Sequence, residues 1–434
     1  MKGAGSRNAG LKDKYRCYLM DALVVCKDKI SNDHLEGSII SSTFPFRGLT
    51  NDLPLSISIA RLQNELSSLN SYRECISLLE NDPRIAKYLN RLVSISPSGS
   101  ARQTPNDFLG RLLLDYLKTV PSSEFREEEF DKLYSLQESY LYSEEISCVS
   151  LTALVNFEAD FDSLEVERGL TIRKISETER IMTSPQQGSI YGFDLITATH
   201  AIEQAYVVPK ILESNRAELQ TRLSEQIESL LVTLRLFSPG NFGTKGTITY
   251  ENQWSPHGGM SLTYPSFQLF YMGRKFSLRN SDLQPFKAFY SEFKSVGKGD
   301  LSLAIRRFNI YYDRRQDADR LIDSIIAFEN LLLPERDELS LRLAIRAANL
   351  LGQTVEEKKT LFATFRKAYD VRSDIIHGSK YATPIKVDEN LSVSLGELVE
   401  RLEGYLRRSI IELFRLLKNK SKEDIISRLT PPFS

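Results

Sequence analysis

The chain has 434 residues, which is too long for one ordinary domain and favours two or three. Its composition, 41% hydrophobic and 26% charged, is that of a globular protein and excludes a disordered or fibrous chain. The formal net charge of −1 gives no overall attraction for nucleic acid, so a surface that binds nucleic acid has to be local.

Membrane association and metal binding are not expected either. No stretch approaches the roughly 18 apolar residues of a membrane-spanning helix, and the first residues lack the apolar segment of a signal peptide. The cysteines form no CxxC pair, and no histidine is spaced to complete a zinc site with them. We therefore predict a cytoplasmic protein with reduced, buried thiols and with no metal or cofactor. The cysteines are Cys17, Cys26, Cys75 and Cys148.

The first region, residues 1–145, is predicted to be mostly helical. Apolar residues recur at helical spacing from Ser56 until the Asp82–Pro83 pair, where proline removes a hydrogen-bond donor and ends the run. We find no residues in this region that indicate chemistry. Further helices are predicted over residues 84–94, 105–117 and 124–142.

The middle region, residues 146–300, has an α/β pattern and is a possible sensor. Two stretches, 149–157 and 164–175, alternate apolar and polar residues as half-buried strands do. Ser176 and Glu179 have the spacing of a capping box that opens a short helix. A long amphipathic helix is predicted next, followed by short strands; the ranges are 215–237, 247–250 and 260–264.

The third region, from Leu301 to the end of the sequence, is predicted to be helical throughout. Its helices end at proline or glycine, and the short connections between them favour antiparallel packing in a bundle. The predicted helices cover residues 304–312, 317–333, 338–351, 355–377 and 395–417.

The clearest chemical signal lies in the stretch Lys367–Gly378. Arg372 precedes His377 by five positions, and Gly378 follows as a residue that ends helices in the left-handed conformation. Histidine changes its charge near neutral pH and suits acid/base catalysis on a ribose 2′-hydroxyl. Arginine stays charged and binds phosphate through two parallel hydrogen bonds. Together they suit metal-independent cleavage of RNA by transesterification.

The spacing alone leaves a structural alternative open. Five residues turn an ideal helix by roughly 500°, so the two side chains point about 140° apart. They can border one cleft if the helix end unwinds or if a second subunit supplies the opposite wall. In the structural alternative, His377 caps the helix and Arg372 forms an ion pair with Asp370, Asp374 or Glu329.

Three stretches resemble the Apea-like HEPN family in order and type: DADRLIDSIIAFENLLL at 317–333, LAIRAA at 343–348 and YDVRSDIIHG at 369–378. They match its acidic helix, its arginine helix and its RSxxxHG-type motif, over the chain from about Leu301 onward. The resemblance implies a mainly α fold with a HEPN-type antiparallel helical bundle at residues 301–434. It also implies a homodimer through this domain and a metal-independent endoribonuclease of phage defence or toxin systems.

By the same resemblance, Arg372 would bind the phosphate and stabilise the transition state, and His377 would be the acid/base. Ser373 and Asp374 occupy positions where the family carries polar residues that orient the histidine. Asp374 in particular is expected to hydrogen-bond a ring nitrogen of His377.

Two further positions match the family's acidic and basic helices, namely Glu329 and Arg346. The alternative for this pair is a buried ion pair that joins two helices, because buried charges must be paired. The predicted helix 395–417 and the residues after it are rich in basic side chains and form a candidate track for RNA phosphates, with a solvated helix face as the alternative. The track comprises Arg407, Arg408, Arg415 and Lys418.

The sequence leaves other functions open. A HEPN module without catalytic activity would bind nucleotide, RNA or a protein partner, and a helical adaptor would have neither role. Whichever function the HEPN region has, the residues before Leu301 are expected to be a sensor of a phage-derived or cellular trigger, or an autoinhibitory cap.

Overall fold

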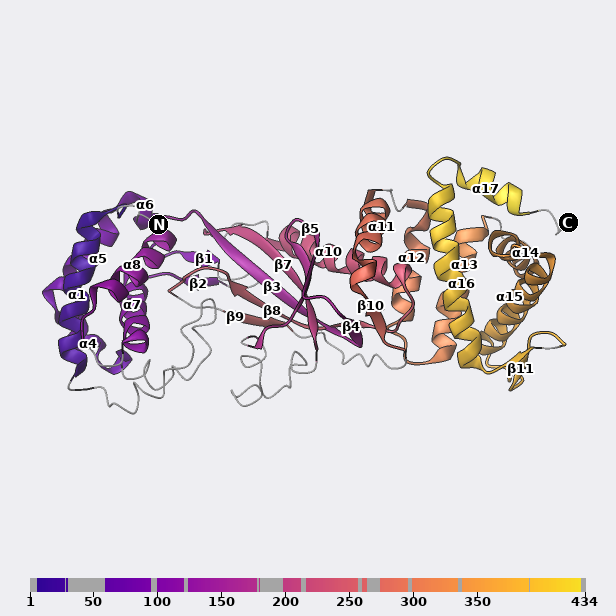
Figure 1. The fold of residues 1–434 in the computed structure, drawn as a ribbon, viewed down its shortest axis with the longest axis horizontal. Helices are drawn as coiled ribbons and strands as arrows, with labels where there is room; N and C mark the ends of the chain where they lie inside the picture. Colours follow the sequence, from indigo (N-terminus) through magenta and orange to yellow (C-terminus); the bar gives the residue numbers. More distant parts are fainter. Residues whose placement is uncertain are drawn as a thin grey trace. The chain divides into compact units, whose positions relative to one another are not determined.

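The computed structural model describes residues 6–27, 29, 59–94, 100–120, 124–177, 179, 198–211, 216–256, 260–263, 274–295, 299–334, 338–389 and 391–430. This part of the chain is mostly helical and contains a small region of β-sheet (Figure 1). It forms two compact units whose segments alternate along the sequence, so boundaries at residues 145 and 300 do not separate them. Unit 1 comprises Met1–Leu154, Asp162–Ser224 and Thr244–Ser266, and unit 2 comprises Val155–Phe161, Glu225–Gly243 and Phe267–Ser434.

Unit 1 begins with a helical part whose core is built from aromatic and aliphatic side chains. The helices predicted over 105–117 and 124–142 are confirmed. The prediction of a helix over 84–94 is wrong. The helix that begins at Pro83 ends after four residues, Asn90 takes the left-handed conformation (φ 58°), and the chain then forms a strand. The elements are α1 (Ala9–Lys27), α4 (Gln63–Ser68), α5 (Asn70–Asn81), α6 (Pro83–Ala86), β1 (Leu92–Ser94), β2 (Ser100–Arg102), α7 (Pro105–Thr119) and α8 (Glu127–Leu141).

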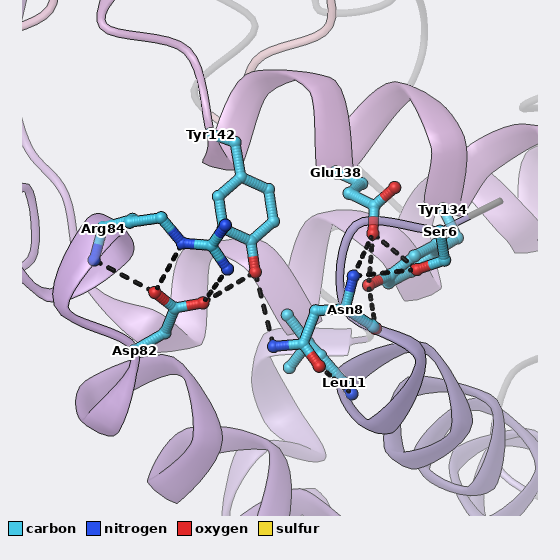
Figure 2. A network of polar contacts seen from close by, with 8 residues as sticks. All are labelled: Ser6, Asn8, Leu11, Asp82, Arg84, Tyr134, Glu138 and Tyr142. Carbon is cyan, nitrogen blue, oxygen red and sulfur yellow. Dashed lines mark hydrogen bonds and ion pairs between the residues drawn. The ribbon is translucent and has the colours of Figure 1, made fainter. Parts of the chain in front are cut away.

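A network of hydrogen bonds ties the start of α1 to the junction of α5 and α6 and to the end of α8 (Figure 2). The Asn8 side chain accepts the amide of Leu11 (3.0 Å) and donates to the hydroxyl of Tyr142 (3.4 Å). That hydroxyl donates to Asp82 (2.8 Å), which also caps α6 by accepting the amide of Arg84 (3.0 Å). The Asp82–Pro83 pair therefore ends one helix and starts the next.

The sheet of unit 1 has the strand order β5-β6-β7-β3-β8-β9. The strand predicted over 164–175 is two strands, because Gly169 turns the chain with φ +78° and a side chain there would meet the carbonyl oxygen of Ala205. Strand β7 lies in the centre of the sheet and was not predicted. The strands are β3 (Glu145–Val155), β5 (Ser163–Glu167), β6 (Leu170–Lys174), β7 (His200–Pro209), β8 (Gly243–Glu251) and β9 (Met260–Thr263).

The capping box predicted after β6 is confirmed. The amide of Ser176 donates to Glu179 Oε2 (2.8 Å), and the amide of Glu179 donates to Ser176 Oγ (3.3 Å). The long helix predicted over 215–237 is also confirmed as α10 (Arg216–Phe237), which contributes residues to both units.

Unit 2 contains the predicted C-terminal helices, each within two residues of its expected range. Helix α13 packs against α12, α15 and α16, and α14 packs against α15 and α17, around one apolar core. Strands β4 (Phe157–Ala159) and β10 (Phe276–Leu278) pair in parallel. The helices are α11 (Leu283–Ser295), α12 (Ser302–Tyr311), α13 (Asp317–Leu332), α14 (Leu339–Leu351), α15 (Val355–Ile376), α16 (Leu395–Leu416) and α17 (Lys422–Leu429).

A buried polar network joins α10, α12 and α16 within unit 2. Arg235 donates to the carbonyls of Phe242 (2.8 Å) and Asn309 (3.1 Å), and Arg407 donates to the carbonyl of Arg235 (2.8 Å). Glu403 accepts hydrogen bonds from Arg407 and from the hydroxyl of Tyr312. Burial raises the pKa of Glu403, and the hydrogen bonds and positive charge only partly oppose this.

Within the described segments, no helix combines the length and the apolar composition that crossing a bilayer requires.

Candidate functional site

Helix α15 carries both candidate catalytic residues, and hydrogen bonds define its two ends. At its start, a Thr–x–x–Glu capping box satisfies the first amides. At its end, Gly378 has φ +68° and its amide donates to the carbonyl of Ile375 (3.2 Å). The amide of Ser379 donates to the carbonyl of Asp374 (2.8 Å), which completes a Schellman motif. The helix stop predicted at Gly378 is confirmed.

The guanidinium of Arg372 is not neutralised by any carboxylate that the structure describes. Among the described residues, no Asp or Glu oxygen lies within 4.0 Å of it, so the alternative ion pair with Asp370, Asp374 or Glu329 is not formed. Its Nε atom is buried without a hydrogen-bond partner. The two terminal nitrogens also make no hydrogen bond in the described part and are not fully buried. Arg372 is thus a half-buried cation without an ion-pair or hydrogen-bond partner among the described residues.

Tyr369 lies beside Arg372 on the same face of α15. The guanidinium carbon of Arg372 lies 5.7 Å from the centroid of the Tyr369 ring. Burial raises the pKa of Tyr369, the nearby charge of Glu329 on α13 raises it further, and Arg372 lowers it. The structure therefore brings Glu329, Tyr369 and Arg372 together.

His377 is the C-cap residue of α15 and its side chain is exposed. In the described part of the chain, its imidazole makes no hydrogen bond. The expected hydrogen bond between Asp374 and a ring nitrogen of His377 is not present in the described part of the chain. Ser373 contributes only its backbone, whose carbonyl accepts the amide of His377 (3.0 Å).

The helix stays regular through Ile376, so its end does not unwind. Arg372 and His377 therefore keep the divergence of about 140° expected from helix geometry, and lie about 7.5 Å apart along the axis. One protomer presents the two groups on different faces of one helix end.

Arg346 is buried and serves the fold. It donates to the carbonyl of Leu332 at the end of α13 (2.8 Å) and to the hydroxyl of Thr430 after α17 (3.2 Å). Because α14 carries Arg346, these bonds join three helices, whereas the ion pair with Glu329 considered from the sequence is not formed. Arg346 therefore does not belong to the surface around Arg372.

The four basic residues of the predicted phosphate track do not share one free surface. Arg407 is internal: its side chain is 11% exposed and bonds Glu403 in the network described above. Arg408 donates to the carbonyl of Leu351 (2.8 Å), Arg415 pairs with Glu412 (3.0 Å), and Lys418 pairs with Glu292. The prediction is wrong for Arg407, since that side chain is used inside the protein.

A pocket of about 470 Å³ lies at the other end of α15, among α14, α15 and α16. Arg408 and Tyr405 line it from α16, and Glu356 and Thr360 line it from α15. Its lining includes one positive side chain, Arg408, and two negative ones, Glu356 and Glu357. The carboxylate of Glu357 accepts hydrogen bonds from backbone amides. Sequence patterns gave no sign of this pocket.

Unit 1 contains a buried lysine that the sequence did not single out. Lys210 follows β7 directly and is 0% exposed. Its ammonium donates to the carbonyl of Tyr140 (2.7 Å) and lies over the rings of Tyr140 (4.1 Å) and Tyr88 (4.4 Å). Burial lowers its pKa to about 7, and the nearby carboxylate of Glu251 opposes this only in part.

Glu251, the last residue of β8, is 3% exposed, and neither carboxylate oxygen has a hydrogen-bond partner in the described part. Burial raises its pKa to about 7, while Ser255, Lys210 and Arg111 act in the opposite direction. No ion pair forms between Glu251 and Lys210. A charged residue at the end of a strand does not reveal from sequence alone that it is buried.

We predict that Glu251→Gln stabilises the protein at pH 8 but not at pH 5. A folded-state pKa raised from 4.5 to about 7 gives stability that is present below pH 4.5 and is lost as pH rises through 7. The variant should gain about 1–3 kcal/mol at pH 8. Urea denaturation of both proteins at the two pH values measures this difference, and equal stability at pH 8 would contradict the prediction.

No cluster of three or more metal-ligating side chains occurs within the described ranges. Comparison of the chain with protein-family models, with curated proteins and with solved structures gave no match.

Proposed function

We propose that the protein is a metal-independent endoribonuclease of the Apea-like HEPN type, in which Arg372 binds the scissile phosphate and His377 transfers protons. The observation that carries this proposal is the state of the two side chains. Among the described residues, Arg372 has no carboxylate partner, and its terminal nitrogens are not fully buried. His377 is exposed on the same helix end, so no described hydrogen bond or ion pair occupies either charged group.

The chemistry follows from the two groups. An imidazole takes the proton of the ribose 2′-hydroxyl, and the resulting oxygen attacks phosphorus. The bond to the 5′-oxygen breaks, and the imidazolium supplies a proton to that departing oxygen. The guanidinium of Arg372 neutralises charge that builds on the phosphate oxygens in the transition state. The product ends are a 2′,3′-cyclic phosphate and a 5′-hydroxyl. None of these steps requires a metal ion.

The geometry favours a site shared by two protomers. Because α15 is regular through Ile376, Arg372 and His377 of one chain diverge by about 140°. A second copy related by a two-fold axis places its own pair on the opposite wall, so that each phosphate meets an arginine and a histidine. In this arrangement the helices of unit 2 act as an antiparallel bundle that fixes the two helix ends. We place this activity in phage defence or a toxin-like system, with a trigger still to be identified.

The test is cleavage of total cellular RNA and tRNA by the purified protein in EDTA, with and without extract from phage-infected cells. We expect cutting that leaves 2′,3′-cyclic phosphate ends. A protein that leaves RNA intact under both conditions, or whose products carry 3′-hydroxyl ends, would contradict the proposal. A sample of Arg372→Ala, purified in the same way, controls for contaminating ribonucleases.

The pocket among α14, α15 and α16 supports a second candidate, a module without catalytic activity that binds a small molecule there. Its volume lies within the range typical of ligand sites, and it lies at the opposite end of α15 from His377. This function predicts that Arg408→Ala abolishes ligand binding, whereas Arg372→Ala leaves binding unchanged.

A further inference from the structure

The side chain of Arg372 contacts the ring of Tyr369, and its guanidinium makes no ion pair or hydrogen bond with the described residues. Tyr369 and Arg372 are three residues apart and so are neighbours on the helix surface. The guanidinium carbon lies 5.7 Å from the centroid of the tyrosine ring, within the range where a cation is attracted to an aromatic face. The Nε atom is buried without a hydrogen-bond partner, and the side chain as a whole is half-buried.

Glu329 also acts on the phenol of Tyr369. Its charge acts on Tyr369 from α13, and α13 packs directly against α15. It nevertheless forms no ion pair with Arg372. The tyrosine therefore interacts with both a carboxylate and an arginine that form no ion pair with each other. A guanidinium already paired with a carboxylate would be a much weaker phosphate ligand.

We propose that Tyr369 is a positioning residue that orients Arg372 toward the RNA phosphate and keeps it apart from Glu329. This inference rests on the proposed function and adds to it a residue that does not itself touch the reacting atoms. Two consequences follow. Loss of the ring should release Arg372 to pair with Glu329, and removal of the Glu329 charge should then restore part of the activity.

The experiment compares Tyr369→Leu, Tyr369→Phe and the double variant Tyr369→Leu/Glu329→Gln with the wild type. We expect Tyr369→Leu to raise KM and lower kcat, with a combined loss of roughly 10-fold or more in kcat/KM. Tyr369→Phe keeps the ring and should stay within about 3-fold of the wild type. The double variant should recover about 3-fold or more relative to Tyr369→Leu.

A matched control is Phe362→Leu, which shortens another half-buried aromatic side chain on α15, two turns before Tyr369. It should cost no activity beyond its effect on the folded fraction, measured by circular dichroism. A purely structural role for Tyr369 would lower the amount of active protein, with KM unchanged and without rescue by Glu329→Gln. That pattern, or equal kcat/KM in Tyr369→Leu and the wild type, would overturn the inference.

Binding of a fluorescently labelled single-stranded RNA provides a second readout that does not depend on cleavage. If the wild type binds RNA but does not cut it, the proposed function fails. The inference on Tyr369 then stands if Tyr369→Leu and Arg372→Ala weaken binding to a similar degree, and it fails if only Arg372→Ala does. A wild type that neither cuts nor binds RNA overturns both.

Discussion

Arg372→Ala and His377→Ala are each expected to lower the rate of RNA cleavage by about 100-fold or more. Loss of a positioned group that stabilises charge in the transition state costs roughly 100- to 1,000-fold, and loss of a general acid/base costs a comparable factor. Because neither side chain has a hydrogen-bond or ion-pair partner in the described part of the chain, each substitution should change the stability of the fold only slightly. Single-turnover cleavage with excess enzyme, together with thermal melting, measures both quantities.

The matched control for this prediction is Arg366→Ala. Arg366 is also a half-buried arginine of α15, but it donates to the hydroxyl of Ser340 on α14 (3.2 Å). We expect near-normal cleavage by this variant. Equal activity of wild type, Arg372→Ala and His377→Ala would place the chemistry elsewhere, and equal loss in all three variants would indicate a general effect of changing α15.

The second large effect is expected from Glu403→Ala, which should destabilise unit 2 by about 3–5 kcal/mol. The carboxylate is 12% exposed and is the ionic partner of Arg407, which is 11% exposed. Its removal leaves Arg407 as a buried charge without a carboxylate in this network and takes away the acceptor of the Tyr312 hydroxyl. Chemical denaturation at pH 7 measures the change in the free energy of unfolding.

Glu412→Ala on the same helix is the appropriate control. Glu412 pairs with Arg415 (3.0 Å), but the two side chains are 46% and 61% exposed. Exposed pairs contribute about 0–1 kcal/mol, so this variant should unfold almost as the wild type does. A similar loss in both variants would show that burial does not set the energy of the Glu403–Arg407 pair.

The helices of unit 2 could be predicted because two independent signals agree there. Apolar residues recur at helical spacing, and Pro334, Gly352 and Gly378 mark the ends. In unit 1 the signals were weaker. The alternation of apolar and polar residues over 164–175 continues through a tight turn at Gly169, so the pattern predicts one strand instead of two. The glycine itself is a turn signal.

The candidate site could be predicted in its residue types but not in its contacts. The spacing of Arg372, His377 and Gly378 is visible in the sequence, and so is the helix stop. Whether an arginine is free or internal depends on packing between elements far apart in the chain. Arg407 and Arg372 look alike in the sequence, yet the first bonds the backbone of Arg235 and the second bonds nothing in the described part.

The alternation of the two units along the sequence has a consequence for synthesis and for fragments. The core of unit 2 combines Val232 and Leu236 with Ile425 and Leu429, so it closes only after translation has passed Leu429. Until then, α15 has no complete bundle to pack against. A fragment that starts at Leu301 lacks Arg235 and part of this core, and we expect it to aggregate instead of forming an autonomous catalytic domain.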